Sequence, residues 1–232
     1  AGLLHMKQLS SDFNAPIHIH LHETTEEIRM GEEQTNQRPI ARLNKLGILN
    51  EKLIAAHMIH LTEDEVALTA DTGMHVVHNP KSNLKLASGF APIQQLLTAQ
   101  ASVCLGTDGA ASNNSLDMWE EMRFAALIGK TKAMDATATP AASVLEMATI
   151  QGARALGYED KIGSLESGKC ADFIAVDCRD ESMQPIFNPI AHLVYVANRH
   201  HVSDVWVNGE RVVDSHILTK LNVSDLLEEA QP

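Results

Sequence analysis

Four short apolar runs, each ending beside a histidine or an aspartate, constrain the fold of this chain more than any other feature. They alternate with segments of helical periodicity, an arrangement typical of βα units around a parallel sheet. We therefore predict an α/β fold with strands at residues 17–22, 53–59, 74–77 and 102–107.

Helical patterns occupy most of the chain between and after these strands. Thr62 and Glu65 have capping-box spacing and predict the start of a helix over residues 63–70. A glycine- and proline-marked loop is predicted over residues 79–92, followed by a helix to about residue 99. Further helices are predicted at residues 26–29, 39–46, 116–128 and 140–156, and Gly129 and Gly157 are expected to end the last two.

Near residue 158 the hydrophobic pattern changes from helical to alternating, which predicts a boundary. Residues 171–177 are expected to form a strand. Asn208 and Gly209 stand between alternating apolar residues and predict a hairpin over residues 204–213 with a type I′ turn. Residues 222–232 form an acidic tail.

Composition narrows the choice of partner. The net charge is −12, with 30 acidic against 18 basic residues, which excludes a nucleic-acid partner and favours a small neutral or cationic substrate. No apolar run is long enough for a membrane span, so no membrane partner is expected. Three cysteines without a pairing pattern favour a reducing, cytoplasmic location. The start at Ala1, without an initiator methionine, suggests a truncated or processed chain.

Residues at the carboxyl ends of parallel strands converge on one site, and the chemistry-bearing side chains stand there. His18, His20 and His22 share a strand face by their spacing of two, and one of them is expected to face a metal. Neutral imidazoles and a carboxylate are ligands that Zn²⁺ prefers, and the ion activates water. The candidate residues are His20, Glu23, His57, His78, Asn79 and Asp108.

Each candidate also has an ordinary structural interpretation. A lone strand histidine is more often a hydrogen-bonded structural residue than a ligand, and a lone aspartate such as Asp108 often caps a helix. The order of the four segments favours the catalytic interpretation. We expect no chemical role for His5, His75, His192, His200, His201 and His216.

Four motifs carry a family resemblance: His-Leu-His-Glu ending at Glu23, Ala-Ala-His-Met-Ile-His around His57, His-Asn-Pro-Lys-Ser-Asn-Leu-Lys-Leu from His78, and Leu-Gly-Thr-Asp-Gly-Ala-Ala-Ser-Asn-Asn around Asp108. In this succession the chain resembles the amidohydrolase superfamily. Within it, the chain looks most like the 5-methylthioadenosine/S-adenosylhomocysteine deaminases and their chlorohydrolase-like relatives. The resemblance covers residues from about 15 to 213.

The resemblance implies a role for each candidate. His20 and Asp108 would be metal ligands on the fifth and eighth barrel strands, with Zn²⁺, or Fe²⁺ or another divalent ion, as the cofactor. Glu23 would protonate the purine ring nitrogen, and His57 would orient or deprotonate the nucleophilic water with help from Asp108. His78 and Asn79 would contact the substrate, as would Glu23 and His57. The implied reaction is attack of metal-bound hydroxide on the amino-bearing carbon, with loss of ammonia.

The chain departs from the family pattern at one point. Members carry a His-x-His pair on the first strand that supplies two further ligands. His18 and His20 have that spacing, but only 88 residues (108 minus 20) separate His20 from Asp108, and the pattern His20-x-x-Glu23 fits the fifth strand better. We therefore predict the C-terminal half of a (β/α)8 TIM-type barrel, strands 5 to 8, over residues 1–157, and the C-terminal part of an accessory β-sandwich over residues 158–221.

A half barrel has unpaired strand edges, which favour association with another chain. The expected partners are a purine nucleoside as substrate, and either further copies of the chain in a homo-oligomer or a complementing N-terminal segment with the His-x-His pair. Three functions stay open: an adenosine-type deaminase; another amidohydrolase, such as a triazine chlorohydrolase or a guanine or cytosine deaminase; and a catalytically incomplete half barrel.

Overall fold

The computed structural model describes residues 2–230 of the chain and contains two four-stranded sheets. The first is parallel, in the order β1 (Ile17–Leu21), β2 (Leu53–His57), β3 (His75–His78) and β4 (Ser102–Leu105). All four predicted strands are present, although three of them end earlier than expected. The predicted α/β class with a parallel sheet is therefore confirmed.

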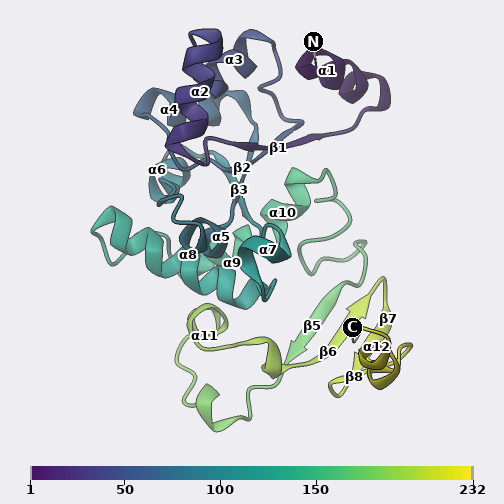
Figure 1. The fold of residues 1–232 in the computed structure, drawn as a ribbon. Coiled ribbons are helices and arrows are strands. Elements are labelled where there is room, and N and C mark those ends of the chain that lie inside the picture. The colour runs from purple at the N-terminus through teal and green to yellow at the C-terminus, as the bar shows by residue number, and fades with distance from the viewer. Residues whose placement is uncertain (1, 231–232) are drawn as a thin grey trace.

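Helices connect consecutive strands of this sheet. They are α2 (Thr25–Thr35) and α3 (Pro39–Lys45) after β1, α4 (Glu63–Thr72) after β2, and α5 (Pro80–Lys85) and α6 (Ile93–Thr98) after β3. The capping box at α4 is confirmed, since the Glu65 N–H donates to Thr62 and the Glu65 carboxylate accepts from the Thr62 N–H. Helix α1 (Gly2–Phe13) precedes β1 and has no buried residue (Figure 1).

Two helix predictions were wrong in detail. Residues 79–92 are not a continuous loop, because Pro80 at the first helical position starts α5. Gly129 does not end its helix, since α8 (Met118–Ala133) runs through it and ends at Met134. Gly129 is buried against Thr139, where an added Cβ would lie 2.2 Å from the threonine hydroxyl oxygen. The glycine therefore permits close packing and does not mark a helix end.

The helix predicted over residues 140–156 is also wrong, because it is two helices. These are α9 (Ala141–Met147) and α10 (Ile150–Ala155), separated by Thr149, whose φ of −131° and ψ of −98° are not helical. Gly157, with a φ of 70°, follows α10 as predicted. Helices α9 and α10 both contact β4 and cover that end of the sheet.

The main core lies between the parallel strands and their helices. Every residue of β2 is buried, as expected for a parallel strand with both faces covered. Leu53, Val76 and Leu96 have no exposed surface, and each such side chain contributes about 1.5–3 kcal/mol by leaving water. In contrast, β1 has partly or fully exposed residues from Ile17 to His20. The sheet is therefore open at β1.

The second sheet is antiparallel, in the order β5 (Phe173–Val176), β6 (Val202–Val207), β7 (Glu210–Asp214) and β8 (Ile217–Leu218). The predicted hairpin is confirmed, and Asn208 and Gly209 have φ of 51° and 79°, as a type I′ turn requires. This sheet lies apart from the parallel one (Figure 1). Short 3₁₀ helices span Glu181–Met183 and Arg199–His201, and α12 (Val223–Glu229) lies in the acidic tail.

Helix α11 (Pro189–Tyr195) lies between β5 and β6 in sequence but packs against α8 and α9. Arg123 on α8 donates to the carbonyls of Tyr195 and Ala197, which holds the end of α11 in place. The segment 158–221 thus contributes a helix that packs on the helices of residues 1–157. The division of the chain into residues 1–157, 158–221 and 222–232 stays a prediction. Among the described residues, no helix is both long and apolar enough to cross a membrane.

Candidate metal and catalytic site

The carboxyl ends of the parallel strands bring His20, His57 and Asp108 together. One ligand atom of each lies within 4.8 Å of the others. The His20 Nε2 atom is 3.6 Å from Asp108 Oδ1, and the rings of His20 and His57 meet edge to face with centroids 4.8 Å apart. Helix α7 (Ala110–Asn113) follows Asp108 directly. Residues 88 positions apart in the sequence thus meet at one edge of the sheet.

Backbone geometry at the strand ends directs these side chains. His22, His57 and Asp108 have φ of 54°, 77° and 56°. The left-handed region is uncommon for residues with a Cβ and costs about 1–3 kcal/mol each, so surrounding contacts must hold it. A residue in this region ends the strand's regular alternation of side chains between the two faces of the sheet, so the side chains there point to a different face than the strand pattern predicts. It concentrates at functional sites.

His57 is fully buried and has one free ring nitrogen. Its Nδ1 is 2.8 Å from Oδ1 of Asn83, an atom that only accepts. Its Nε2 has no hydrogen-bond partner among the described residues and lies 3.8 Å from a carboxylate oxygen of Glu23. A buried nitrogen lone pair without a partner is costly unless an ion or a substrate uses it.

Asp108 is held by two hydroxyl groups. Its Oδ2 accepts from Ser82 at 2.7 Å and from Ser112 at 2.6 Å, which leaves Oδ1 facing His20. Burial alone would raise the pKa of Asp108, but the hydrogen bonds from Ser112 and Ser82 bring it below its usual value. The carboxylate is therefore ionised at neutral pH.

A buried carboxyl group ties together the segments around Asp108. Glu121 on α8 accepts from the side chain of Asn113 and from the backbone N–H of Lys81, and Asn113 also donates to the carbonyl of Thr107. Burial raises the pKa of Glu121. Its contacts join the loop that carries Asp108 to the start of α5.

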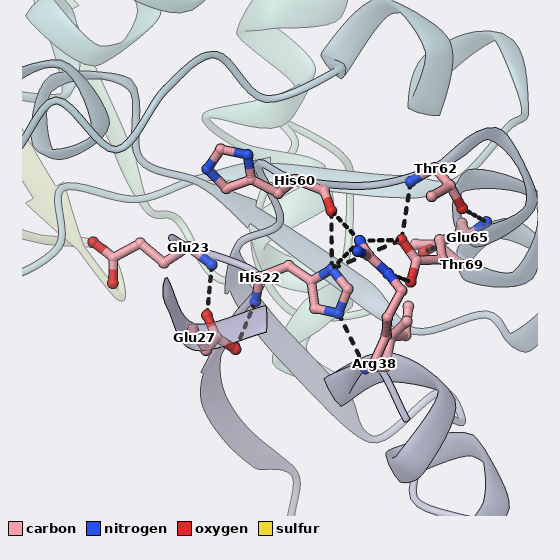
Figure 2. Close-up of polar contacts among 9 residues, drawn as sticks. His22, Glu23, Glu27, Arg38, His60, Thr62, Glu65 and Thr69 are labelled. Atoms are coloured by element: carbon pink, nitrogen blue, oxygen red, sulfur yellow. Dashed lines mark hydrogen bonds and ion pairs between the residues drawn. The ribbon is translucent and has the colours of Figure 1, made fainter. Parts of the chain in front are cut away.

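Glu23 lies just after β1, and its backbone and its side chain form hydrogen bonds with different residues. The carboxylate of Glu27 accepts from the N–H groups of His22 and Glu23 at 2.9 and 2.8 Å, as Figure 2 shows. The Glu23 side chain projects away from Glu27 in this view and accepts from the hydroxyl of Ser88 at 3.2 Å. Its side chain is 21% exposed, so a substrate can reach it.

The prediction that His18, His20 and His22 share one face was wrong for His22. The positive φ at His22 turns its ring to the opposite side, where it is fully buried. Its Nε2 accepts from the N–H of Ile40 and its Nδ1 donates to the carbonyl of His60. Burial lowers the pKa of His22. His22 is therefore a structural residue with both ring nitrogens in use.

Arg38 and Glu65 complete the network around His22. The Arg38 guanidinium binds both Glu65 carboxylate oxygens, at 2.6 and 2.9 Å, and also donates to the carbonyl of His60 (Figure 2). Burial alone would raise the pKa of Glu65, but hydrogen bonds from Arg38 and from the Thr62 backbone bring it below its usual value. We refer to His22, Arg38, His60 and Glu65 as the buried network.

His78 and Asn79 are each only 2% exposed. Burial, and then the nearby His57, lower the pKa of His78 to about 3, so its ring is neutral. Nδ1 of His78 and Oδ1 of Asn79 have no partner among the described residues. The structure places both below the surface of the site, and their contact with substrate stays a prediction.

The donor set fits a divalent metal ion. Two imidazoles and an ionised carboxylate converge, and the unpartnered Nε2 of His57 faces them. This combination of nitrogen and oxygen ligands suits Zn²⁺ and is also used for Fe²⁺. From the sequence, His57 was predicted to orient or deprotonate the water and to contact the substrate, and not to bind the metal. The geometry adds that its Nε2 lies within ligand range of the same point.

Five residues that hold the site were not predicted from the sequence, namely Ser82, Asn83, Ser88, Ser112 and Glu121. Ser82, Asn83 and Ser112 stand inside the quoted motifs, but a single hydroxyl or amide side chain has no distinguishing sequence pattern. Only the folded chain shows which atom each one contacts.

Comparison with known proteins agrees with this geometry. A model of the amidohydrolase family matches residues 1–212. The chain belongs to the amidohydrolase family. Over 221 residues this amidohydrolase is 48% identical to the 5-methylthioadenosine/S-adenosylhomocysteine deaminase of Teredinibacter turnerae, a match that covers 95% of this chain and 50% of the relative. The corresponding Moorella thermoacetica protein is 46% identical over 208 residues, with 90% of this chain and 49% of the relative covered.

Solved structures extend the likeness to the fold. A zinc-bound adenosine deaminase from Xanthomonas campestris superposes with a TM-score of 0.97 at 46% identity, covering 98% of this chain and 52% of that one. A zinc-bound atrazine chlorohydrolase from Arthrobacter aurescens has a TM-score of 0.90 at 26% identity, covering 96% and 49%. The chain thus spans about half the length of the curated relatives it matches.

Proposed function

We propose that this amidohydrolase is a metal-dependent aminohydrolase that deaminates an adenosine-type nucleoside of the 5-methylthioadenosine or S-adenosylhomocysteine class. The convergence of His20, His57 and Asp108 beside Glu23 carries the proposal. The names of the similar deaminases support the substrate class. In the reaction, water adds to the amino-bearing ring carbon, and ammonia leaves as a carbonyl group forms.

Each residue has a task that its surroundings permit. His20 and Asp108 would hold the metal ion, which when bound supplies Lewis acidity that makes water easier to deprotonate. His57 presents an Nε2 lone pair that accepts the proton of the water. Glu23 delivers a proton to the ring nitrogen next to the attacked carbon, and Ser88 orients its carboxyl group.

The same proposal assigns the chain to strands 5 to 8 of a (β/α)8 barrel, with β1 as the fifth strand. Within the described residues, β1 pairs with β2 alone and keeps one edge open. Beside it lies a groove of about 470 Å³ whose apolar lining includes Leu3, Ile19, Leu21 and Met30. We propose that a complementing segment with a His-x-His pair covers this edge and adds the remaining metal ligands.

The test is ammonia release from 5-methylthioadenosine and S-adenosylhomocysteine with zinc present. The chain is assayed alone and together with the half of the Teredinibacter turnerae relative that it does not match. Release by the combination, abolished in Asp108→Asn, is the expected result. No release from either nucleoside by a combination shown to associate would count against the proposal.

A second candidate is a chlorohydrolase, which the similarity to the atrazine enzyme favours. The same assay with atrazine, guanine and cytosine as substrates shows which leaving group, chloride or ammonia, is released and from which ring. The third candidate, a non-catalytic half barrel, predicts a folded homo-oligomer that binds no zinc and turns over none of these compounds, whether or not the second half is added. Metal analysis and light scattering decide that case.

A further inference from the structure

The hydrogen bond between the His57 ring and the Asn83 side chain has no assigned task in the proposed reaction. Both side chains are excluded from water, with His57 fully buried and Asn83 only 2% exposed. We propose that Asn83 is a positioning residue that holds the proton of His57 on Nδ1, so that the Nε2 lone pair faces His20, Glu23 and Asp108.

The first step concerns the partner of Nδ1. A neutral imidazole has one N–H. The hydrogen-bond partners of the two ring nitrogens determine which nitrogen carries the proton. The Asn83 Oδ1 atom lies 2.8 Å from Nδ1 and can only accept. Burial leaves no water to compete for this nitrogen. The proton therefore belongs on Nδ1.

The second step concerns the position of Asn83 itself. It lies on α5, whose start is set by Pro80, and its N–H donates to the carbonyl of Asn79 at 3.0 Å. The preceding residue, Ser82, donates to Asp108. Two consecutive side chains of one short helix thus hold two of the three converging residues.

The third step concerns Nε2. It lies 3.8 Å from a Glu23 carboxylate oxygen, and no described residue donates to it. If Asn83 offered no acceptor, the proton could move to Nε2 and point at Glu23. That tautomer can neither accept a proton from water nor bind an ion through Nε2. Asn83 therefore decides whether His57 can act.

The test is the ¹⁵N NMR spectrum of the histidine side chains in the metal-free chain at a pH where they are neutral. The His57 signals are assigned by their loss in His57→Gln. In the unmodified chain, Nδ1 is expected to have a pyrrole-type shift and Nε2 a pyridine-type shift. A pyrrole-type shift on Nε2 in the unmodified chain would overturn the proposal.

Substitutions sharpen this test. Asn83→Leu removes the acceptor at similar volume and is expected to move the His57 proton to Nε2. Asn83→Asp keeps an acceptor oxygen and is expected to keep the proton on Nδ1. The neighbouring Ser82→Ala, which alters the contact with Asp108 instead, is expected to leave the His57 shifts in place. An unchanged tautomer in Asn83→Leu, or a pyridine-type Nδ1 in Asn83→Asp, would contradict the assignment.

His22 supplies an internal reference for folding. Its tautomer is set by the Ile40 N–H and the His60 carbonyl, neither of which depends on Asn83. Retention of the His22 shifts in each variant shows that the site is folded. Were Asn83→Leu to lose them, the unmodified chain and Asn83→Asp would still decide the question.

The consequence for rate rests on the proposed function. In a deamination assay of the complemented enzyme, Asn83→Leu is expected to lower kcat by about 10- to 100-fold, as for other groups that orient a reacting histidine. The change is expected to fall on kcat more than on KM, because Asn83 is only 2% exposed and contacts His57. If no deamination occurs at all, the proposed function fails, while the NMR result still stands by itself.

Discussion

His22 follows β1 directly, and His57 is the last residue of the neighbouring strand β2. Both are fully buried and both have a positive φ, yet their ring nitrogens have opposite surroundings. His22 has both ring nitrogens bonded and belongs to the buried network with Arg38 and Glu65. His57 has one nitrogen bonded, and the other has no partner among the described residues and lies near the carboxylates of Glu23 and Asp108. A buried polar atom without a partner destabilises the fold, so its persistence points to a use. The satisfied histidine stabilises the fold, and the unsatisfied one is the candidate for chemistry.

The largest expected effect is on the turnover number, when a group beside the unpartnered nitrogen of His57 is changed. Glu23→Gln removes the proton that the proposed mechanism delivers, and we expect kcat of the complemented enzyme to fall by about 10²- to 10⁴-fold. Thermal unfolding should change little, since Glu23 is partly exposed. Glu33→Gln is the matched control, because Glu33 lies on the surface and Arg29 is its ion-pair partner in residues 2–230. Equal activity in the two variants would remove Glu23 from the mechanism.

On the side of the buried network, the expected effect is on stability. Arg38→Met removes the guanidinium from the Glu65 carboxylate and the His60 carbonyl, which then keep only the Thr62 N–H and His22 Nδ1 as donors. We expect the free energy of unfolding to fall by about 1–3 kcal/mol. Chemical denaturation measures this change. The zinc affinity of the folded variant should match that of the unmodified chain. A loss of zinc at unchanged stability would mean that the network belongs to the site.

Acid should weaken the buried network through His22. Burial lowers its pKa below the ordinary value of about 6.5, so its contribution to stability is complete above that pH and is lost as the pH falls toward the folded pKa. We expect the free energy of unfolding to fall below about pH 6.5, and the slope to be smaller in His22→Gln. His75 and His78 shift in the same direction, so some slope persists. An identical slope in the variant would exclude His22 as a source.

The smallest expected change in stability is at His20. Its side chain is 60% exposed, so His20→Gln should change the free energy of unfolding by no more than about 0.5 kcal/mol. Zinc binding, measured by titration calorimetry, should nevertheless weaken. His18→Gln on the same strand face is the control and should keep its zinc affinity. A large stability loss without a change in zinc binding would reverse the roles assigned to His20 and His22.

Much of the parallel sheet was predictable because its signals are local. Apolar runs of four to seven residues between helical segments located β1 to β4, and the Thr62 capping box located α4. Gly129 was wrongly predicted to end a helix, because a glycine that permits packing against Thr139 has the same sequence signal as a helix end. Residues 79–92 were wrongly predicted to be a loop, because Pro80 starts α5.

The candidate site was likewise predictable in part. Strand ends converge in any parallel sheet, so the meeting of His20, His57 and Asp108 followed from their positions in the chain. The orientation of His22 did not, because a single residue in the left-handed region reverses the alternation of a strand. Likewise, the hydrogen-bond partners of the His22 and His57 rings and of the Glu23 carboxylate come from segments 16 to 65 residues away. Local pattern specified which residues reach the site, whereas long-range packing set which of their atoms are bonded and which stay free to react.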